Sequence, residues 1–334
     1  MRATPTAALR DAVARPALSP ETDAALLAAT ARLREAAGDT LVGCIFFGSR
    51  RTRAANANAF SAYDLFAVVE AYRPFYEALR RAGLSGKSPG LLAAISRLLP
   101  PTQVSVVFRE PELRAKVSVV RRDVLARETS ARRRDHFTIG RLFQPSRILA
   151  ARTDEAREEL LGALVSAHAE TWKWSRPWLP ESFDAQSYGR RLLEVSMSWE
   201  VRPEPAGRAA ALWEAQRSIQ APVYDVLLHE LAGAGALRSS GSETEAWSIT
   251  QIPGSFEKLR LRFYFSLSML RATARWGKHI LSFEGWLDYI VRKASRHTGE
   301  TIELSERERR WPLVFLWGRV FRYLRRKDGK DPRP

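Results

Sequence analysis

The fold is decided by two short apolar runs, Leu41-Val42-Gly43-Cys44-Ile45-Phe46-Phe47-Gly48-Ser49 and Tyr63-Asp64-Leu65-Phe66-Ala67-Val68-Val69-Glu70. Each run is rich in β-branched and aromatic side chains and is too short for a typical helix. We therefore predict two buried strands, one ending at Phe47 and the other beginning at Tyr63. Gly48 and Ser49 end the first strand, and a polar loop rich in Arg, Ala and Asn joins it to the second.

The sequence around these two strands predicts further helices and strands. Helical patterns cover residues 20–37, 71–84, 91–99 and, with a break, 123–142. Strand patterns cover residues 103–108, 114–121 and 146–150, and Glu110-Pro111 marks the turn between the first two. This order of strands and helices predicts an α+β fold with a mixed sheet.

The second half of the chain has a different pattern. From Thr153 onward the apolar residues recur mostly at helical spacing, and Gly233 to Ser242 forms a Gly- and Ser-rich loop. Tryptophans cluster before Pro180, where we expect a junction. We divide the chain into residues 1–152 with the mixed sheet, residues 153–300 with a mainly helical accessory domain, and residues 301–334 with a basic tail.

The composition restricts the classes of partner. The chain has 53 Lys and Arg against 37 Asp and Glu, a net charge of +16, so we expect nucleic acid, nucleotide phosphates or anionic lipid as partners. Cys44 is the only cysteine, which excludes an intrachain disulfide and a multi-cysteine zinc site. No apolar stretch reaches the ~18 residues of a membrane-spanning helix, and residues 1–20 lack the apolar core of a secretory signal.

Gly48, Ser49, Ser61 and Asp64 form a pattern suited to a nucleoside triphosphate. Small residues let backbone N–H groups approach phosphates closely. A carboxylate early in the next strand can hold Mg²⁺, which neutralises charge on the phosphates. The layout resembles the nucleotidyltransferase superfamily with one departure: the superfamily has two acids flanking an apolar residue, whereas this chain has Ala62-Tyr63-Asp64.

A longer series of motifs narrows this resemblance. The series begins with Phe47-Gly48-Ser49 and Asp64 and continues with Glu70, Lys116-Val117-Ser118-Val119-Val120, Gly140-Arg141-Leu142-Phe143-Gln144-Pro145 and Arg147-Ile148-Leu149. Over residues 40–205 this order resembles the mitochondrial-type phosphatidate cytidylyltransferases, also called the translocator assembly and maintenance family, and the chain looks like a bacterial relative. It departs from that family where Arg50 replaces a second Gly and Glu70 replaces an Asp.

The resemblance implies an enzyme that makes CDP-diacylglycerol and pyrophosphate from CTP and phosphatidic acid, with Mg²⁺, at a membrane surface. It implies that Asp64 and Lys116 are catalytic and that Asp64 and Glu70 bind the metal. The residues that it implies for nucleotide binding are Gly48, Ser49, Arg50, Ser61 and Arg141. It also implies a nucleotidyltransferase-like sheet, a winged-helix-like helical domain, and a peripheral location on the inner, cytoplasmic face of the bacterial membrane.

Several of these residues also have a purely structural interpretation. Asp64 could cap a neighbouring loop, Glu70 could be a solvated acid, and Lys116 could be an edge-strand lysine that discourages aggregation. Arg141 suits a phosphate contact, but cations are also favoured at helix C-termini. We interpret His136 as structural, because the five histidines form no cluster with metal-ligand spacing.

The last thirty residues combine apolar and basic side chains. Ser305 to Pro334 contains ten Lys or Arg and four Asp or Glu. Beyond Pro312, apolar and aromatic residues recur at helical spacing, with arginines on the opposite face. This pattern predicts an amphipathic helix lying on an anionic membrane. The alternative is a terminal helix packed on the core with a solvated basic face.

A second function class also fits the charge. A basic nucleic-acid-binding or RNA-modifying protein on a nucleotidyltransferase-like fold would explain the net charge of +16, and the missing second carboxylate would suit an inactive version. The sequence shows no recognition-helix pattern, aromatic RNA-binding motif or zinc finger. We therefore prefer the lipid enzyme and expect no nucleic acid partner.

Overall fold

Both decisive strands are present in the computed structural model of the protein, as β1 (Leu41–Phe47) and β2 (Tyr63–Val69). The structure describes residues 6–48, 50–51, 62–109, 112–200, 207–239, 246–282, 291 and 304–310. The chain divides into two compact units, Met1–Arg275 and Trp276–Pro334. The fold and the site described below belong to the first unit.

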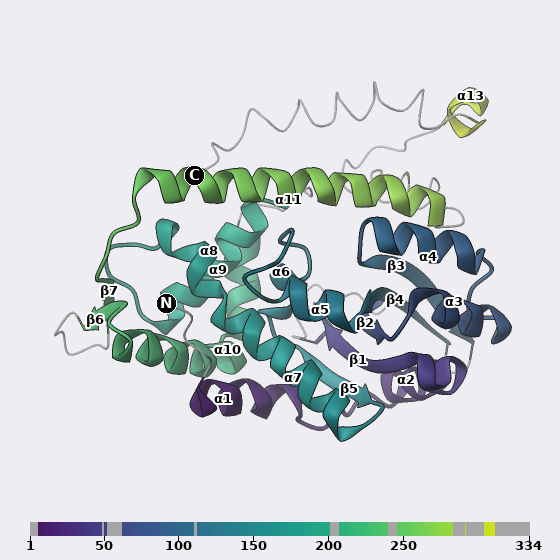
Figure 1. Ribbon diagram of the computed structural model, residues 1–334, viewed down its shortest axis with the longest axis horizontal. Coiled ribbons are helices and arrows are strands. Elements are labelled where there is room, and N and C mark those ends of the chain that lie inside the picture. Colours follow the sequence, from purple (N-terminus) through teal and green to yellow (C-terminus); the bar gives the residue numbers. More distant parts are fainter. Residues whose placement is uncertain are drawn as a thin grey trace. The chain divides into compact units, whose positions relative to one another are not determined.

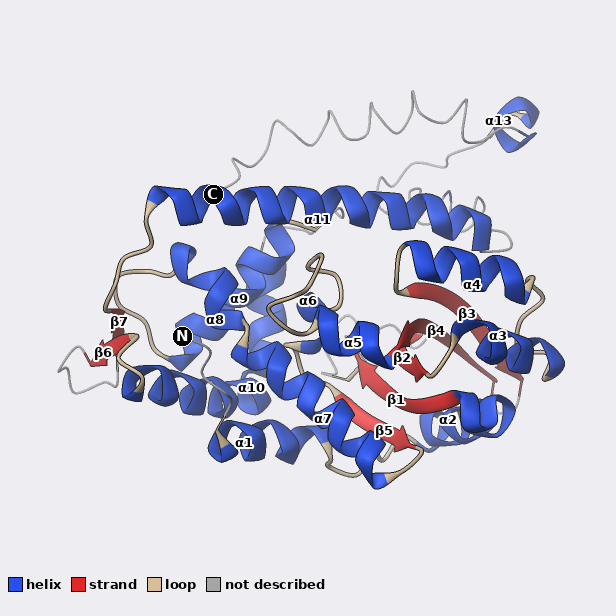
Figure 2. Ribbon diagram, in the orientation of Figure 1, coloured by secondary structure: helices blue, strands red, loops and turns tan. Residues whose placement is uncertain are grey.

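β1 and β2 lie inside a five-stranded sheet with the strand order β3-β4-β2-β1-β5 (Figures 1 and 2). The other strands are β3 (Thr102–Arg109), β4 (Glu112–Arg121) and β5 (Arg147–Ala151). β2 and β4 are parallel, and the remaining pairs are antiparallel. A parallel pair requires a crossover connection, which α3 (Tyr72–Arg81), α4 (Pro89–Leu98) and β3 supply. The predicted α+β class with a mixed sheet is confirmed.

Helices and apolar side chains cover both faces of this sheet, which explains why its inner strands read as continuous apolar runs. Leu65 and Ala67 belong to one apolar core, together with residues of α2 (Ala24–Ala37), α3 and α4. Phe66 belongs to a second core, which continues into the helical half of the chain. Because side chains alternate along a strand, Asp64 lies on the same face as Phe66.

The remaining elements follow in chain order. They are α1 (Ala7–Ala17), a 3₁₀ turn (Gly38–Thr40), α5 (Arg122–Glu128), α6 (Ile139–Leu142), α7 (Asp154–Ala169), α8 (Thr171–Ser175), a second 3₁₀ turn (Arg176–Trp178), α9 (Ala185–Ser198), α10 (Arg208–Gly233), β6 (Leu237–Ser239), β7 (Trp247–Ile249), α11 (Ser255–Ser282) and α13 (Glu306–Arg310). β6 pairs with β7, so part of the predicted Gly- and Ser-rich loop is a strand. Within the ranges given above, no helix is both long and apolar enough to cross a bilayer.

The helical half packs closely around aromatic side chains. Gly189 of α9 faces Trp213 of α10 so tightly that a Cβ on Gly189 would lie 2.2 Å from the Trp213 ring. The same core contains Leu9 of α1 and Phe66 of β2, and therefore joins residues on both sides of the predicted boundary at residues 152 and 153. The compact units divide instead between Arg275 and Trp276.

Candidate functional site

The first part of the candidate site is the turn that follows β1. β1 and β2 are antiparallel, and Phe47 at the end of β1 pairs with Asp64 near the start of β2. Gly48 has a φ of +90°, and a Cβ on Gly48 would lie 2.7 Å from Oδ2 of Asp64. Only glycine avoids both the backbone strain and this clash. The sequence therefore places the Asp64 carboxylate directly against this turn.

The second part of the site is Lys116 on the neighbouring strand. Asp64 and Lys116 are register partners in the parallel pair β2–β4, so their side chains leave the same face of the sheet side by side. Both residues are partly buried. Ser105 of β3 is the partner of Lys116 on its other side. The two predicted catalytic residues, 52 positions apart in the sequence, are thus neighbours in the fold.

Two arginines that the sequence analysis did not single out lie at the same end of the sheet. The backbone N–H of Arg51 donates to the carbonyl of Gly48 over 3.0 Å, which closes the turn after β1. Arg147 starts β5 and pairs with Phe46 of β1. Burial and the neighbouring charge of Arg147 lower the pKa of Arg51. Two guanidinium groups therefore repel one another at the end of β1.

Arg51 and Arg147 make fewer hydrogen bonds than their guanidinium N–H groups could donate. Arg51 reaches the carbonyl of Pro16 over 3.4 Å, whereas Arg147 donates to Glu21 over 2.6 Å and to Ser19 over 2.9 Å. The Nε atoms of both arginines are buried, and neither has a hydrogen-bond partner among the described residues. An anion bound between Arg51 and Arg147 would reduce their mutual repulsion. Phosphate suits such a position, because arginine and phosphate form strong charge-assisted hydrogen bonds.

Arg50, predicted to bind the nucleotide, is stacked on an aromatic ring. Its Cζ lies 3.9 Å from the centroid of the Tyr63 ring, and the Tyr63 hydroxyl donates to Asp23. Burial and the hydrogen bond to Asp23 raise the pKa of Tyr63 to about 12, so this hydroxyl stays protonated at neutral pH. Because Tyr63 and Asp64 are consecutive in β2, Arg50 stacks on a side chain of the opposite face from Asp64.

Glu70, the second predicted metal ligand, lies at the far end of β2. Six residues separate it from Asp64, a distance of about 20 Å along a strand. Glu70 accepts hydrogen bonds from Arg152 over 2.6 Å and from Arg122 over 2.9 Å, and these contacts lower its pKa. The structure does not bring Glu70 and Asp64 together, so they cannot hold the same ion.

With Glu70 excluded, Asp64 is the candidate Mg²⁺ ligand at the end of β1 and the start of β2. Among the described residues, no group of three or more His, Cys, Asp or Glu side chains converges on one point. Protein-bound Mg²⁺ commonly takes only one or two carboxylates and completes its shell with substrate phosphates and water. Asp64 fits one such position beside the Gly48 turn. Ser49 and Ser61, also predicted to bind the nucleotide, lie outside the described residues.

Arg141 and Gly140 belong to a separate, closely packed cluster. The Arg141 guanidinium lies 3.7 Å from the Phe137 ring centroid and donates to the Phe137 carbonyl over 2.8 Å. A Cβ on Gly140 would lie 3.0 Å from the His136 ring and 3.2 Å from Oγ of Ser196. The His136 ring nitrogen Nε2 and Oγ of Ser196 are 3.1 Å apart, and burial lowers the pKa of His136 to about 3. His136 is therefore a neutral, buried packing residue at physiological pH.

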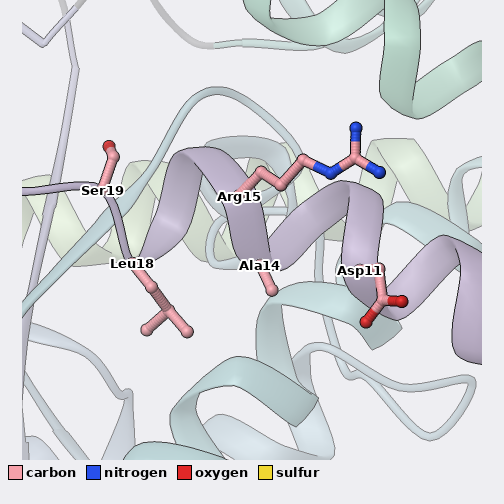
Figure 3. A pocket seen from close by; sticks show the side chains of 5 residues that line it. All are labelled: Asp11, Ala14, Arg15, Leu18 and Ser19. Atoms are coloured by element: carbon pink, nitrogen blue, oxygen red, sulfur yellow. The ribbon is translucent and has the colours of Figure 1, made fainter.

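A shallow pocket lies next to Arg147. It has a volume of about 430 Å³ and is lined by Asp11, Ala14, Arg15, Leu18 and Ser19, on and just after α1 (Figure 3). Ser19 is also the residue that accepts a hydrogen bond from Arg147. The lining of the pocket contains one acid, one base and no aromatic ring, so we assign this pocket no role of its own.

Comparison of the sequence with known proteins gives no match from which a role for these residues could be taken. No protein-family model matches the chain, and no curated protein matches it at a significant level.

Proposed function

We propose that the chain is a nucleotidyltransferase that converts CTP and phosphatidic acid into CDP-diacylglycerol and pyrophosphate at the inner, cytoplasmic surface of the bacterial membrane. The observation that carries the proposal is the position of Asp64, which lies against the Gly48 turn on one side and beside Lys116 on the other. The choice of CTP and phosphatidic acid comes from the order of motifs between Phe47 and Leu149.

The reaction needs little covalent chemistry from the protein. A phosphate oxygen of phosphatidic acid forms a bond to the α-phosphorus of CTP, and the bond from that phosphorus to the β-phosphate oxygen breaks. The electron pair leaves with pyrophosphate, so atoms and charge balance. Catalysis then rests on positioning and on offsetting the negative charge that gathers around the α-phosphorus.

Gly48, Asp64 and Lys116 each have a role in this scheme. The backbone of the Gly48 turn approaches the β- and γ-phosphates, and Asp64 is a ligand of the nucleotide-bound Mg²⁺. When bound, Mg²⁺ neutralises charge on the phosphates. Lys116 offsets charge on the face it shares with Asp64. Arg147 pairs with Phe46 rather than with Phe47, so its side chain leaves the sheet on the face opposite Asp64, and we give Arg51 and Arg147 no role in the transfer.

The finer fold assignment is part of the same proposal. A five-stranded mixed sheet followed by a mainly helical segment supports a nucleotidyltransferase-like domain. The β6–β7 pair between α10 and α11 supports a winged-helix-like second part, because winged helices combine helices with a short hairpin.

The decisive experiment supplies every substrate separately. The purified full chain is incubated with one labelled nucleoside triphosphate at a time, Mg²⁺ and vesicles containing phosphatidic acid, and the lipid is then extracted. We expect label in the lipid fraction with CTP and not with ATP, GTP or UTP. A parallel reaction with RNA in place of the vesicles tests the nucleic acid alternative.

Two carboxylate variants on the same strand provide the matched comparison. Asp64→Asn is expected to reduce lipid labelling on the order of 100-fold or more, because it removes the metal ligand. Glu70→Gln, at the other end of β2, is expected to keep most of the activity, because its ion pairs are partly exposed and weak. Equal activities in the two variants would contradict the assignment of Asp64.

A further inference from the structure

The outward face of α11 carries a row of large apolar side chains that the fold leaves exposed. Phe256, Leu259, Phe263, Leu267 and Leu270 recur three or four positions apart and therefore line one side of the helix. Their exposed fractions run from 42% at Leu267 to 80% at Phe256. We call these five residues the outer stripe. It runs over 15 residues, from Phe256 to Leu270, a rise of about 21 Å along the helix axis.

The outer stripe is not the face by which α11 packs on the protein. That face is formed by Leu261, Phe265 and Ser268, all of which are buried. Ser268 accepts a hydrogen bond from the backbone of His136 over 2.9 Å, and Phe265 lies 5.4 Å from the ring of Trp199. α11 is drawn as the long helix along the outside of the described helices (Figure 1). α11 is therefore apolar on two sides, and its inner side is already packed against the rest of the protein.

Basic side chains flank the outer stripe. Arg260 and Arg262 are exposed and lie on either side of it, and no carboxylate of the described part of the chain pairs with either of them. The neighbouring acid, Glu257, is neutralised by a bidentate pair with Arg176. The surface of this part of α11 is therefore apolar along its centre and positive beside it.

We propose that the outer stripe of α11 docks on an anionic lipid bilayer. A helix that lies in the bilayer interface inserts its apolar side chains at the boundary of the acyl chains and leaves its cations among the head groups. Aromatic and aliphatic residues in one row, with Arg260 on one side and Arg262 on the other, match that arrangement. This inference deepens the proposed function, because it identifies the surface that meets the lipid substrate, but its test needs no catalysis.

The charge argues for lipid over a second copy of the chain. In a twofold dimer the same patch meets itself, so the two arginines beside each stripe would meet the two arginines of the other copy. Like charges at such a contact oppose association, whereas an anionic bilayer attracts each basic residue near its surface.

The test uses the full chain and vesicles of phosphatidylcholine with or without phosphatidylglycerol. Phosphatidylglycerol supplies negative charge without being the proposed substrate, so sedimentation with these vesicles reports the surface alone. We expect binding to the anionic vesicles, weaker binding at high salt, and little binding to pure phosphatidylcholine. The triple variant Phe256→Ser, Leu259→Ser, Phe263→Ser is expected to bind at least tenfold more weakly.

Matched controls come from α3 and α4. Leu91 and Leu98 of α4 are also exposed leucines, and the double change Leu91→Ser, Leu98→Ser is expected to leave vesicle binding unchanged. For the charges, Arg260→Gln, Arg262→Gln is compared with Arg80→Gln, Arg81→Gln at the exposed end of α3, so both variants lose two positive charges. We expect only the α11 set to lose the salt-dependent part of the binding. Circular dichroism melts establish that every variant is folded.

Three outcomes would overturn the proposal. Unchanged sedimentation of the folded stripe variant would show that the outer stripe does not meet lipid. A wild-type dimer that becomes monomeric in the stripe variant, with equal vesicle binding, would make the stripe a self-contact. Complete loss of binding on removal of Pro312–Pro334, with the stripe variant still bound, would assign all binding to the tail. Wild-type chain that binds these vesicles but makes no CDP-diacylglycerol would contradict the proposed function and leave the docking inference standing.

Discussion

Gly48 and Asp64 show how the absence of one side chain shapes the candidate site. Gly48→Ala would force a Cβ to within 2.7 Å of the Asp64 carboxylate and would strain a backbone with a φ of +90°. We expect a loss of about 1–3 kcal/mol in the free energy of unfolding. We also expect CTP binding to weaken about tenfold or more, because the carboxylate must move away from the turn. Calorimetric titration with CTP and Mg²⁺ measures the affinity.

Gly83→Ala is the control for this prediction. Gly83 also has a positive φ, +70°, but no atom lies within 4 Å of the position that a Cβ would occupy. The Gly83→Ala variant should have a lower melting temperature, because alanine is strained at a positive φ, but it should bind CTP as tightly as the wild type. If Gly48→Ala and Gly83→Ala bound CTP equally well, the turn after β1 would not be a nucleotide site.

His136 provides a prediction about pH. Burial lowers the pKa of this side chain to about 3, whereas an unfolded histidine titrates near pH 6.5. The unfolded chain therefore binds the proton first, and the stability of the folded protein falls as pH drops from about 6.5 towards 3. We expect His136→Gln to show a shallower loss of unfolding free energy between pH 7 and pH 4 than the wild type. Urea melts at each pH measure the difference, and identical slopes would contradict it.

The elements of the sheet differ in how far the sequence predicts them. β1 and β2 were predicted within a residue of their ends, because a strand buried on both faces has a continuous apolar pattern. α1 was missed, since its buried face consists of only Leu9, Val13 and Ala17 and the helix contains Pro16. The predicted helix at residues 123–142 is divided into α5 and α6, as the break in its pattern indicated.

The arrangement of the site was harder to predict than its residues. Asp64 and Lys116 were both singled out, but their adjacency depends on β2 and β4 being parallel neighbours. No local pattern gives strand order, because a crossover can return a strand to either side of its partner. The predicted pairing of Glu70 with Asp64 at one metal was wrong, and strand geometry alone argues against it, because six residues of extended chain span about 20 Å.

Gly43 at the centre of β1 supports a prediction about sheet packing. A Cβ on Gly43 would lie 2.6 Å from the Ala150 carbonyl oxygen of β5 and 2.6 Å from Leu160 of α7. Gly43→Ala should therefore destabilise the protein by about 1–3 kcal/mol through overpacking. Gly162→Ala, in the same α7, meets no atom within 4 Å and should stabilise by up to about 1 kcal/mol. Urea melts of the two variants are the measurement, and equal midpoints would contradict the packing described for β1.

At the scale of the whole molecule, one apolar core extends further than the predicted domain division. The sequence changes period near Thr153, which is a change of local structure rather than of packing. Leu9, Phe66 and Tyr224 share one core, because α1 and α10 pack where local periodicity cannot place them. The tail at residues 311–334 lies outside the described residues, so its predicted membrane helix stays a prediction.

The attachment of α11 gives the last prediction. Asp135 is 1% exposed and pairs with Arg275 over 2.5 Å and with Arg271 over 2.8 Å. Burial opposes its ionisation, but these two arginines lower its pKa overall. Asp135→Asn leaves Arg275 buried without its counter-charge, and we expect a loss of about 3–5 kcal/mol. Asp123→Asn removes an exposed pair with Arg121 and should cost at most about 1 kcal/mol. Similar unfolding midpoints for the two variants in urea would contradict this account of α11.

The late position of α11 in the chain also sets a timetable for synthesis. The five-stranded sheet is complete once Ala151 has left the ribosome, whereas Phe265, which covers His136 and Trp178, follows 114 residues later. At ~5–20 residues per second that interval is roughly 6–23 s. During this interval the strands of the sheet have all been synthesised, but Phe265 does not yet cover the rings of His136 and Trp178. The rings of His136 and Trp178 therefore stay without this cover until α11 emerges.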